Sequence, residues 1–134
     1  MPTQLSMFDL FREPPIRLAV DPDGHVIQDR IHTVLSLGHP RYAYERARIE
    51  LHPHAALWMW ATAYHLDGDC GQGHRVGPKW GKFAPDLETA LYWATQELQT
   101  ALAPRRKSRS KDAILKWLST VEPAASAIHH HAID

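Results

Sequence analysis

Positive charge is concentrated in one short stretch of the sequence. Five basic residues fall within seven positions of the C-terminal third: Arg105, Arg106, Lys107, Arg109 and Lys111. Clustered cations release counterions when they meet a polyanion, so this run predicts contact with the phosphates of nucleic acid. Lys79 and Lys82 can extend the same patch. The competing interpretation is a solvated linker between two helices that binds nothing.

A second group of residues combines positive charge with aromatic rings. Five side chains are expected on one face of a β-hairpin: Arg46, Arg48, Trp58, Trp60 and Tyr64. Bases of single-stranded nucleic acid stack on exposed rings while guanidinium groups meet the phosphates. The first four are therefore candidate nucleic-acid contacts. Alternatively, both tryptophans pack in the core against a helix, because a chain of this size needs large residues inside.

The N-terminus carries a short apolar motif in a proline-flanked segment, Gln4-Leu5-Ser6-Met7-Phe8. It resembles the pentapeptide with which bacterial proteins dock on the replicative sliding clamp, whose pattern is Gln-Leu-Ser/Asp-Leu-Phe. The resemblance covers five of the 134 residues, and Met7 stands where the pattern has leucine. Methionine conserves volume and apolarity at that place.

The resemblance implies a role for each residue of the motif. Gln4 would hydrogen-bond at the edge of the clamp pocket, and Leu5 would make a secondary contact. Met7 and Phe8 would fill the apolar groove. Two alternatives remain: the segment packs back onto its own domain as an arm, or it binds another partner.

Residues suited to catalysis or metal binding form no known constellation. The histidines and the single cysteine gather in one region, comprising His52, His54, His65, Cys70 and His74. Their spacing is not that of a zinc finger, and no Cys-x-x-Cys pair is present. Cys70 with His65 or His74 is the one local nucleophile–base pair, and nothing suggests an oxyanion-stabilising group. We expect a protein that is not an enzyme and that has no metal or other cofactor.

The overall composition is that of an ordinary globular protein, with 44% hydrophobic and 22% charged residues. Fifteen basic residues balance fifteen acidic ones, so attraction to nucleic acid must come from local patches. No apolar run reaches the roughly 18 residues of a membrane helix, and no signal peptide is visible. One cysteine excludes an intrachain disulfide. We expect a cytoplasmic protein without membrane contact.

These candidate residues must be positioned by a small α+β domain, which we expect over residues 16–122, between tails at 1–15 and 123–134. Apolar alternation predicts a first hairpin at 16–27, around the turn Asp21-Pro22-Asp23-Gly24. It predicts a second hairpin at 46–66, in which residues 52–56 interrupt the alternation.

Helical spacing predicts three helices. A short one begins at Asp29 and ends before Gly38, and a long one spans residues 86–102 after a glycine-rich loop at 67–81. That loop lacks the residue order of a phosphate-binding P-loop. The last helix is capped by Ser110 and ends at Pro123. The expected fold is a small antiparallel hairpin sheet packed by C-terminal helices, with one hairpin face on helix 86–102.

The order of these elements loosely resembles the β-β-β-α DNA-binding domains of phage integrases, with residues 79–83 leading into the helix. Together the patterns predict a DNA-associated accessory protein of a bacterium, phage or plasmid. It would dock on the sliding clamp and contact nucleic acid through its basic linker. The alternative is a non-catalytic interaction module that inhibits or redirects host DNA-processing machinery without binding nucleic acid. The oligomeric state stays open.

Overall fold

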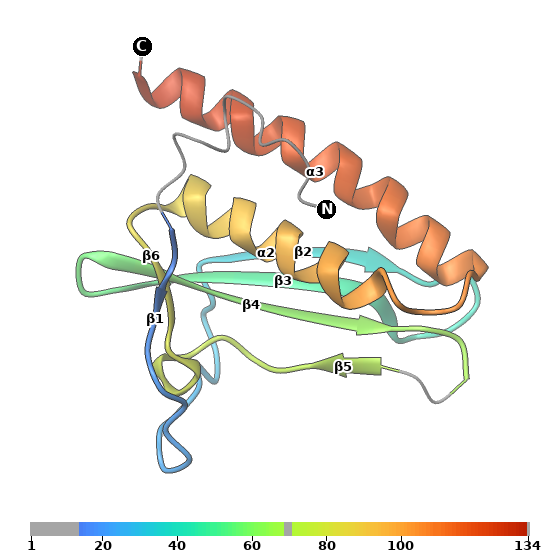
Figure 1. Cartoon of the computed structure of the whole chain (residues 1–134), viewed down its shortest axis with the longest axis horizontal. Coiled ribbons are helices and arrows are strands. Elements are labelled where there is room, and N and C mark those ends of the chain that lie inside the picture. Colours follow the sequence, from blue (N-terminus) through green and yellow to red (C-terminus); the bar gives the residue numbers. More distant parts are fainter. Residues whose placement is uncertain (1–13, 69–70, 134) are drawn as a thin grey trace.

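An antiparallel sheet carries both helices on one of its faces (Figure 1). The computed structural model describes residues 14–68 and 71–133, with side chains as far as Val121. Within these residues the six strands are ordered β1-β6-β4-β3-β2, and β5 pairs with β4. The strands are β1 Ile16–Arg17, β2 Thr33–Gly38, β3 Glu45–His54, β4 Leu57–His65, β5 Gly71–Gly73 and β6 Lys82–Ala84. The helices are the 3-10 turn η1 Pro78–Trp80, α2 Leu87–Leu102 and α3 Arg109–Ile133. The predicted α+β class is confirmed.

The hairpin of β3 and β4 forms the centre of the sheet, as predicted. Its register runs from Ala47 opposite Tyr64 to His54 opposite Leu57. The strands continue through the segment expected to interrupt them, so only two residues form the turn. One of these, Ala55, has a φ of 55°, the left-handed conformation that tight hairpin turns require.

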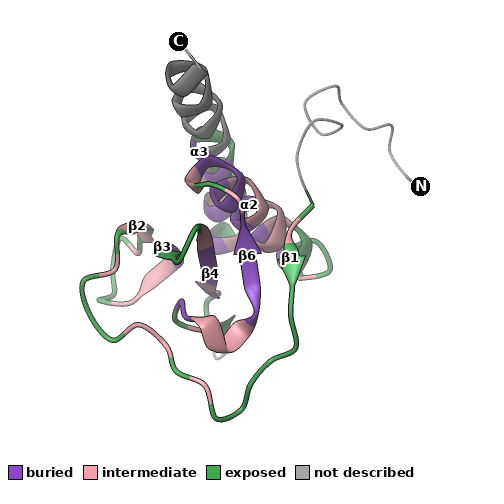
Figure 2. Ribbon diagram, turned by 90° about the vertical axis from the view of Figure 1, so that its left-hand side faces the viewer, coloured by how far each residue is buried: buried purple, intermediate pink, exposed green. Residues whose placement is uncertain are grey.

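The main core lies between this hairpin and the helices (Figure 2). Ile49 and Leu51 of β3 alternate inward, and Trp60 of β4 joins them. From α2 the buried stripe includes Leu91 and Leu98, at helical spacing. The prediction that the hairpin packs one face on this helix is confirmed. The Asp86 side chain caps α2 by accepting from the Thr89 amide at 2.7 Å.

The opposite face of β4 is covered by loops, which explains why both faces of this strand are apolar. Met59 and Phe83 are buried there with Val76. Two of the covering loop segments are joined by a backbone hydrogen bond, which the Ile27 amide donates to the Val76 carbonyl at 2.8 Å. The approach is so close that a Cβ at Gly77 would lie 2.5 Å from the Cα of Val26.

Two predictions for the N-terminal half are wrong. The short helix expected from Asp29 is instead the strand β2, which pairs with β3. Its Leu35 and Leu37 pack on the core at a period of two, which suits a strand. The hairpin at 16–27 does not form, because β1 pairs with β6. Only its turn is present, with the Gly24 amide bonded to the Asp21 carbonyl at 2.9 Å.

The C-terminal helix also differs from its prediction at both ends. Its cap is Ser108, whose hydroxyl accepts from the Lys111 amide at 3.1 Å, and not Ser110, which is buried. The helix does not end at Pro123 but continues to Ile133, so the predicted tail at 123–134 is largely helical. The alanines that follow the proline favour helix, and a proline within a helix can be accommodated by a kink in place of a stop. None of the described helices combines the length and apolarity needed to cross a bilayer.

Candidate nucleic-acid interface

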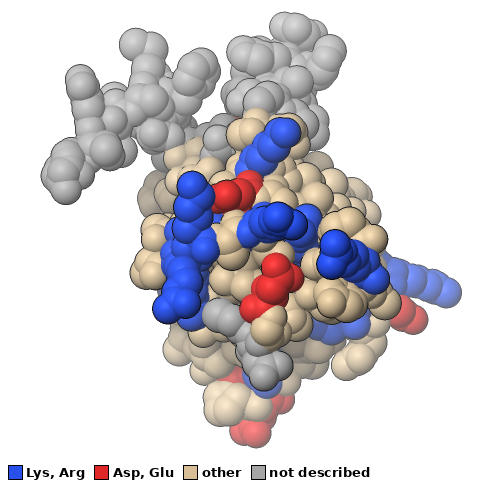
Figure 3. All heavy atoms as spheres, turned by 90° about the vertical axis from the view of Figure 1, so that its right-hand side faces the viewer, with Lys and Arg blue, Asp and Glu red and all other residues tan. Residues whose placement is uncertain are grey.

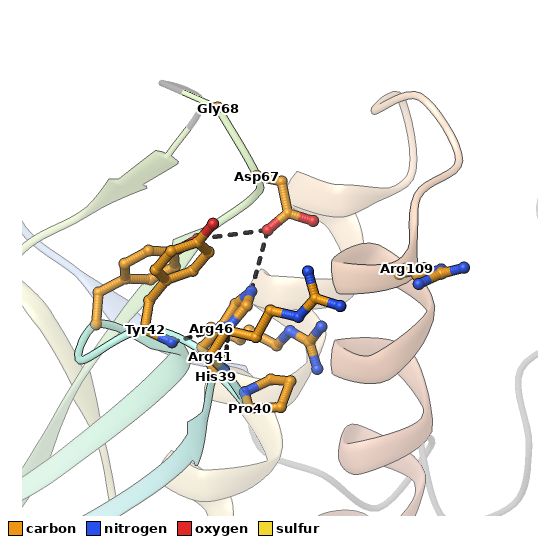
Figure 4. A pocket seen from close by; sticks show the side chains of 9 residues that line it. His39, Pro40, Arg41, Tyr42, Arg46, Asp67, Gly68 and Arg109 are labelled. Atoms are coloured by element: carbon orange, nitrogen blue, oxygen red, sulfur yellow. Dashed lines mark hydrogen bonds and ion pairs between the residues drawn. The ribbon is translucent and has the colours of Figure 1, made fainter.

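The start of β3, the end of β4 and the start of α3 meet at one end of the molecule. They enclose an open hollow of about 700 Å³ (Figure 4). Three arginines line it: Arg41 and Arg46, which are close in the sequence, and Arg109, which is more than sixty residues away. Tyr42 and Tyr44 line it beside His39, and among the residues that the structure describes Asp67 is the one acid in its wall. Arg46 and Arg109 were predicted as nucleic-acid contacts, and the topology of the fold brings them together.

A β-bulge aims Arg46 toward the helices. Leu37 pairs with Ala47 and Gly38 pairs with Glu45, so Arg46 is an extra residue in β3. A bulge of this kind redirects a side chain from the regular alternation of a strand. The Arg46 Nε accordingly donates to the Ser110 hydroxyl of α3 at 3.1 Å. The guanidinium is thereby fixed between the sheet and the helix.

The loop between β2 and β3 is fixed by His39. Its Nδ1 accepts hydrogen bonds from the amides of Arg41 at 3.0 Å and Tyr42 at 3.3 Å. Because Nδ1 accepts, the ring proton lies on Nε2, which faces the Asp67 carboxylate at 3.3 Å. The Tyr44 hydroxyl donates to the same carboxylate oxygen, also at 3.3 Å.

Asp67 remains ionised in this setting. Partial loss of water acts to raise the pKa of its carboxyl, but hydrogen bonds from Ser110, His39 and Tyr44 outweigh it and hold that pKa below its ordinary value. Loss of water and the Asp67 charge raise the pKa of Tyr44, so its hydroxyl stays protonated and continues to donate. The two rings are therefore tethered to one anionic group.

Three rings stack in a row at this end, which we call the ring column (Tyr42, Tyr44 and His65). Tyr42 lies nearly parallel to Tyr44, with centroids 5.4 Å apart and planes at 11°. Tyr44 stacks in turn on His65 at 4.1 Å and 24°. Tyr42 is 58% exposed and forms the outer end. Sequence reasoning missed Tyr42, although two arginines and two tyrosines fall within residues 41–46.

The basic linker borders the same hollow, and its residues have different roles. Arg106 and Lys107 are exposed, as is Arg109. Arg105 is half-buried, with its guanidinium 5.9 Å from the centre of the Tyr64 ring. Lys111 folds back and donates from Nζ to the carbonyl of Arg105 at 2.7 Å, near the end of α2. There it complements the negative helix terminus, so it is the least available of the five for a ligand.

Figure 3 looks at this end of the molecule and shows lysine and arginine side chains gathered over it, with acidic side chains between them. We give the name basic end to the three arginines that line the hollow together with the basic residues that precede Arg109 in the basic linker. The basic end thus comprises Arg41, Arg46, Arg105, Arg106, Lys107 and Arg109. The neutral total charge of the chain thus conceals a local excess of positive charge.

The tryptophans predicted to stack on bases belong to the core. Trp60 is only 1% exposed, so no base can reach its ring. Trp58 packs against the same core, with the His32 ring edge-on at 4.8 Å. Arg48 is occupied by ion pairs to Glu50 at 2.6 Å and Glu45 at 3.2 Å. These three predicted contacts are corrected: the packing of α2 on this face buries Trp60 and half-buries Trp58, and the acids neutralise the arginine.

Lys79 and Lys82 do not extend the basic end. Figure 1 places η1 and β6 toward the other end of the sheet from the start of α3. Lys82 is 6% exposed, and its Nζ donates to Glu97 at 2.9 Å and 3.0 Å. Burial lowers the pKa of the Lys82 ammonium. The Nζ of Lys79, which is half-buried, lies 5.2 Å from the centre of the Trp80 ring.

The remaining candidate residues are partly outside the described residues. Gln4, Leu5, Met7 and Phe8 lie there, and so does Cys70. Within residues 14–68 and 71–121, no group of three or more His, Cys, Asp or Glu side chains is arranged to hold a metal ion. No protein-family model matches the chain, and no curated protein or solved structure is detectably similar to it.

Proposed function

We propose that this protein binds nucleic acid at its basic end. The observation that carries the proposal is the hollow lined by Arg41, Arg46 and Arg109 beside stacked rings. The planar guanidinium group of arginine can donate two parallel hydrogen bonds to phosphate oxygens. Arg46 and Arg109 belong to β3 and α3, and these elements are held in place by the fold. The proposed function is binding and not catalysis, in a DNA-associated accessory protein of a bacterium, phage or plasmid.

Salt dependence tests this proposal directly. The variant Arg106→Ala/Arg109→Ala removes two exposed charges from the basic end. Each phosphate contact contributes about 0.7 to the slope of log affinity against log salt for a single strand. We therefore expect the slope to flatten by about one to two units, measured by fluorescence anisotropy with a labelled oligonucleotide across a sodium chloride series.

The matched control is Arg75→Ala/Lys116→Ala, which removes two exposed charges from elsewhere on the molecule. It should leave the slope unchanged, because these residues do not belong to the basic end. If both double variants behaved alike, attraction would come from net charge and not from the basic end. Absence of binding by the intact protein would favour the interaction module without nucleic acid.

A second part of the proposal is that the N-terminal peptide docks on the bacterial sliding clamp. It is supported by the resemblance of residues 4–8 to the docking pattern. We expect the peptide to bind with micromolar affinity, about 8 kcal/mol, and to derive most of it from desolvated apolar anchors. Met7 and Phe8 should therefore dominate.

Calorimetry with purified clamp tests the docking. We expect the intact protein to bind, while the protein lacking residues 1–11 and the variant Met7→Ala/Phe8→Ala do not. The control variant Thr3→Ala/Asp9→Ala flanks the pentapeptide and should bind like the intact protein. Equal binding by all of these proteins, or no binding by any, would refute docking through this peptide.

A further inference from the structure

The ring column ends in solvent, and its end is the Tyr42 ring. Tyr42 is 58% exposed, whereas its inner neighbour Tyr44 is covered on one side by Tyr42 and on the other by His65. A planar, apolar ligand can extend such a column by one more layer. An exposed aromatic face of this kind is what single-strand binding proteins offer to a base.

The position of Tyr42 is held before any ligand arrives. Its amide donates to His39 Nδ1 at 3.3 Å, and the His39 ring lies 4.7 Å from the Tyr42 ring. His39 is held by Asp67, which also accepts from Tyr44. A platform with few remaining degrees of freedom loses little conformational entropy when a base stacks on it.

Groups that suit phosphate lie beside the platform. Arg41 directly precedes Tyr42, and Arg46 follows two residues after Tyr44; Arg109 lines the hollow from α3. Figure 4 shows the side chains of Arg41 and Arg46 side by side, with their guanidinium groups directed toward α3 and away from the Tyr42 ring. A nucleotide presents a planar base and an anionic phosphate joined by a sugar, and this hollow offers a counterpart for each.

We infer that the ligand of the basic end is single-stranded nucleic acid, with one unpaired base stacked on Tyr42 and the adjoining phosphates against the arginines. The inference rests on the proposed function and narrows its ligand class. In a duplex both faces of each internal base are covered by its neighbours, so no internal base is free to stack on the Tyr42 ring. An abasic strand carries the same phosphates but has no base to stack on this ring.

The experiment compares three ligands of equal length: a thymine single strand, an abasic single strand and a blunt duplex. The intact protein should bind the thymine strand more tightly than the abasic strand. The loss of one stacking contact, by removal of the base or by Tyr42→Ala, should weaken binding roughly 5- to 150-fold. Tyr42→Ala should bind the thymine and abasic strands alike, with an unchanged salt slope.

Tyr42→Phe and Tyr42→Trp are the controls, because both keep a ring at the outer end and should retain the preference for bases. Tyr42 is an exposed residue, so all three variants should keep the melting temperature of the intact protein. Salt-dependent binding that was equal for the thymine strand, the abasic strand and the duplex would overturn this inference and leave the proposed function standing. No binding to any of the three would overturn both.

Discussion

The buried ion pair between Lys82 and Glu97 offers the sharpest test of how β6 is joined to α2. The Lys82 side chain is 7% exposed and that of Glu97 is 26% exposed, with 2.9 Å between Nζ and Oε1. The carboxylate also accepts from the Trp60 indole at 3.4 Å and from the Thr62 hydroxyl. Four hydrogen-bond contacts thus converge on one carboxylate at the edge of the core.

Removing the negative charge should destabilise the protein more than removing the positive charge. Glu97→Gln leaves a buried ammonium without a counter-charge, which costs about 3–5 kcal/mol when burial is complete. Because the Glu97 side chain is partly exposed to water, we expect the free energy of unfolding to fall by about 3 kcal/mol. For a chain of this size this corresponds to a fall of roughly 10 °C in melting temperature. Lys82→Met leaves the carboxylate with two donors and some water, and should cost about 1–2 kcal/mol.

Urea denaturation followed by tryptophan fluorescence measures these costs. The double variant Lys82→Met/Glu97→Gln should cost less than the two single changes together, by at least about 1 kcal/mol, because the partners are coupled. The control is Glu45→Gln, which breaks the exposed pair with Arg48 and should cost less than about 1 kcal/mol. Additive effects, or a loss from Glu97→Gln no larger than from Glu45→Gln, would refute the reasoning.

The pH dependence of stability gives the pair a second signature. Burial acts to raise the pKa of Glu97, but Lys82 and the two hydrogen-bond donors outweigh it and hold that pKa below its usual value of 4.5. A lowered carboxyl pKa means that the unfolded state binds the proton more tightly. Its stabilisation is therefore present above about pH 4.5 and is lost as pH falls through the folded-state pKa. Glu97→Gln should lack this loss on acidification.

Two further predictions concern packing. Leu98→Ala should lower the free energy of unfolding by about 2–5 kcal/mol in urea titration, because this side chain is 1% exposed in the core. Leu115→Ala, at a site 37% exposed, should cost far less, and equal costs would contradict the assigned core. Gly81→Ala should lower the melting temperature by several degrees, since φ is 65° and a Cβ would lie 2.4 Å from the Leu18 carbonyl oxygen. Gly38→Ala has open space around it and should behave like the intact protein in the same thermal scan.

Local patterns in the sequence were sufficient to predict the elements that are long. Alternation over β3 and β4 predicts the central hairpin, because each strand spans enough residues for a period of two to be distinct. Helical spacing and the Asp86 cap predict α2 for the same reason. The exposed basic residues of the linker were also recognisable from their clustering, since charge density is a property of the chain alone.

Partners that are distant in the chain decided the rest. The segment of β2 is short enough to suit a helix or a strand, and pairing with β3 selects the strand. β1 finds its partner in β6, more than sixty residues away, which no local pattern encodes. Which face of β4 turns inward also depended on where α2 packs, so Trp60 became core and not binding surface.

The candidate site shows most clearly which features the sequence determined and which features depended on the tertiary structure. The sequence by itself determined the residue types: arginines and aromatic side chains in residues 39–46, and a cationic run before α3. Only the tertiary structure brought Arg41, Arg46 and Arg109 around one hollow and stacked the Tyr42 ring at its side. The physical reason is that a β-bulge and a sheet–helix contact join segments that are far apart in the chain, and the free energy of that contact belongs to the folded whole.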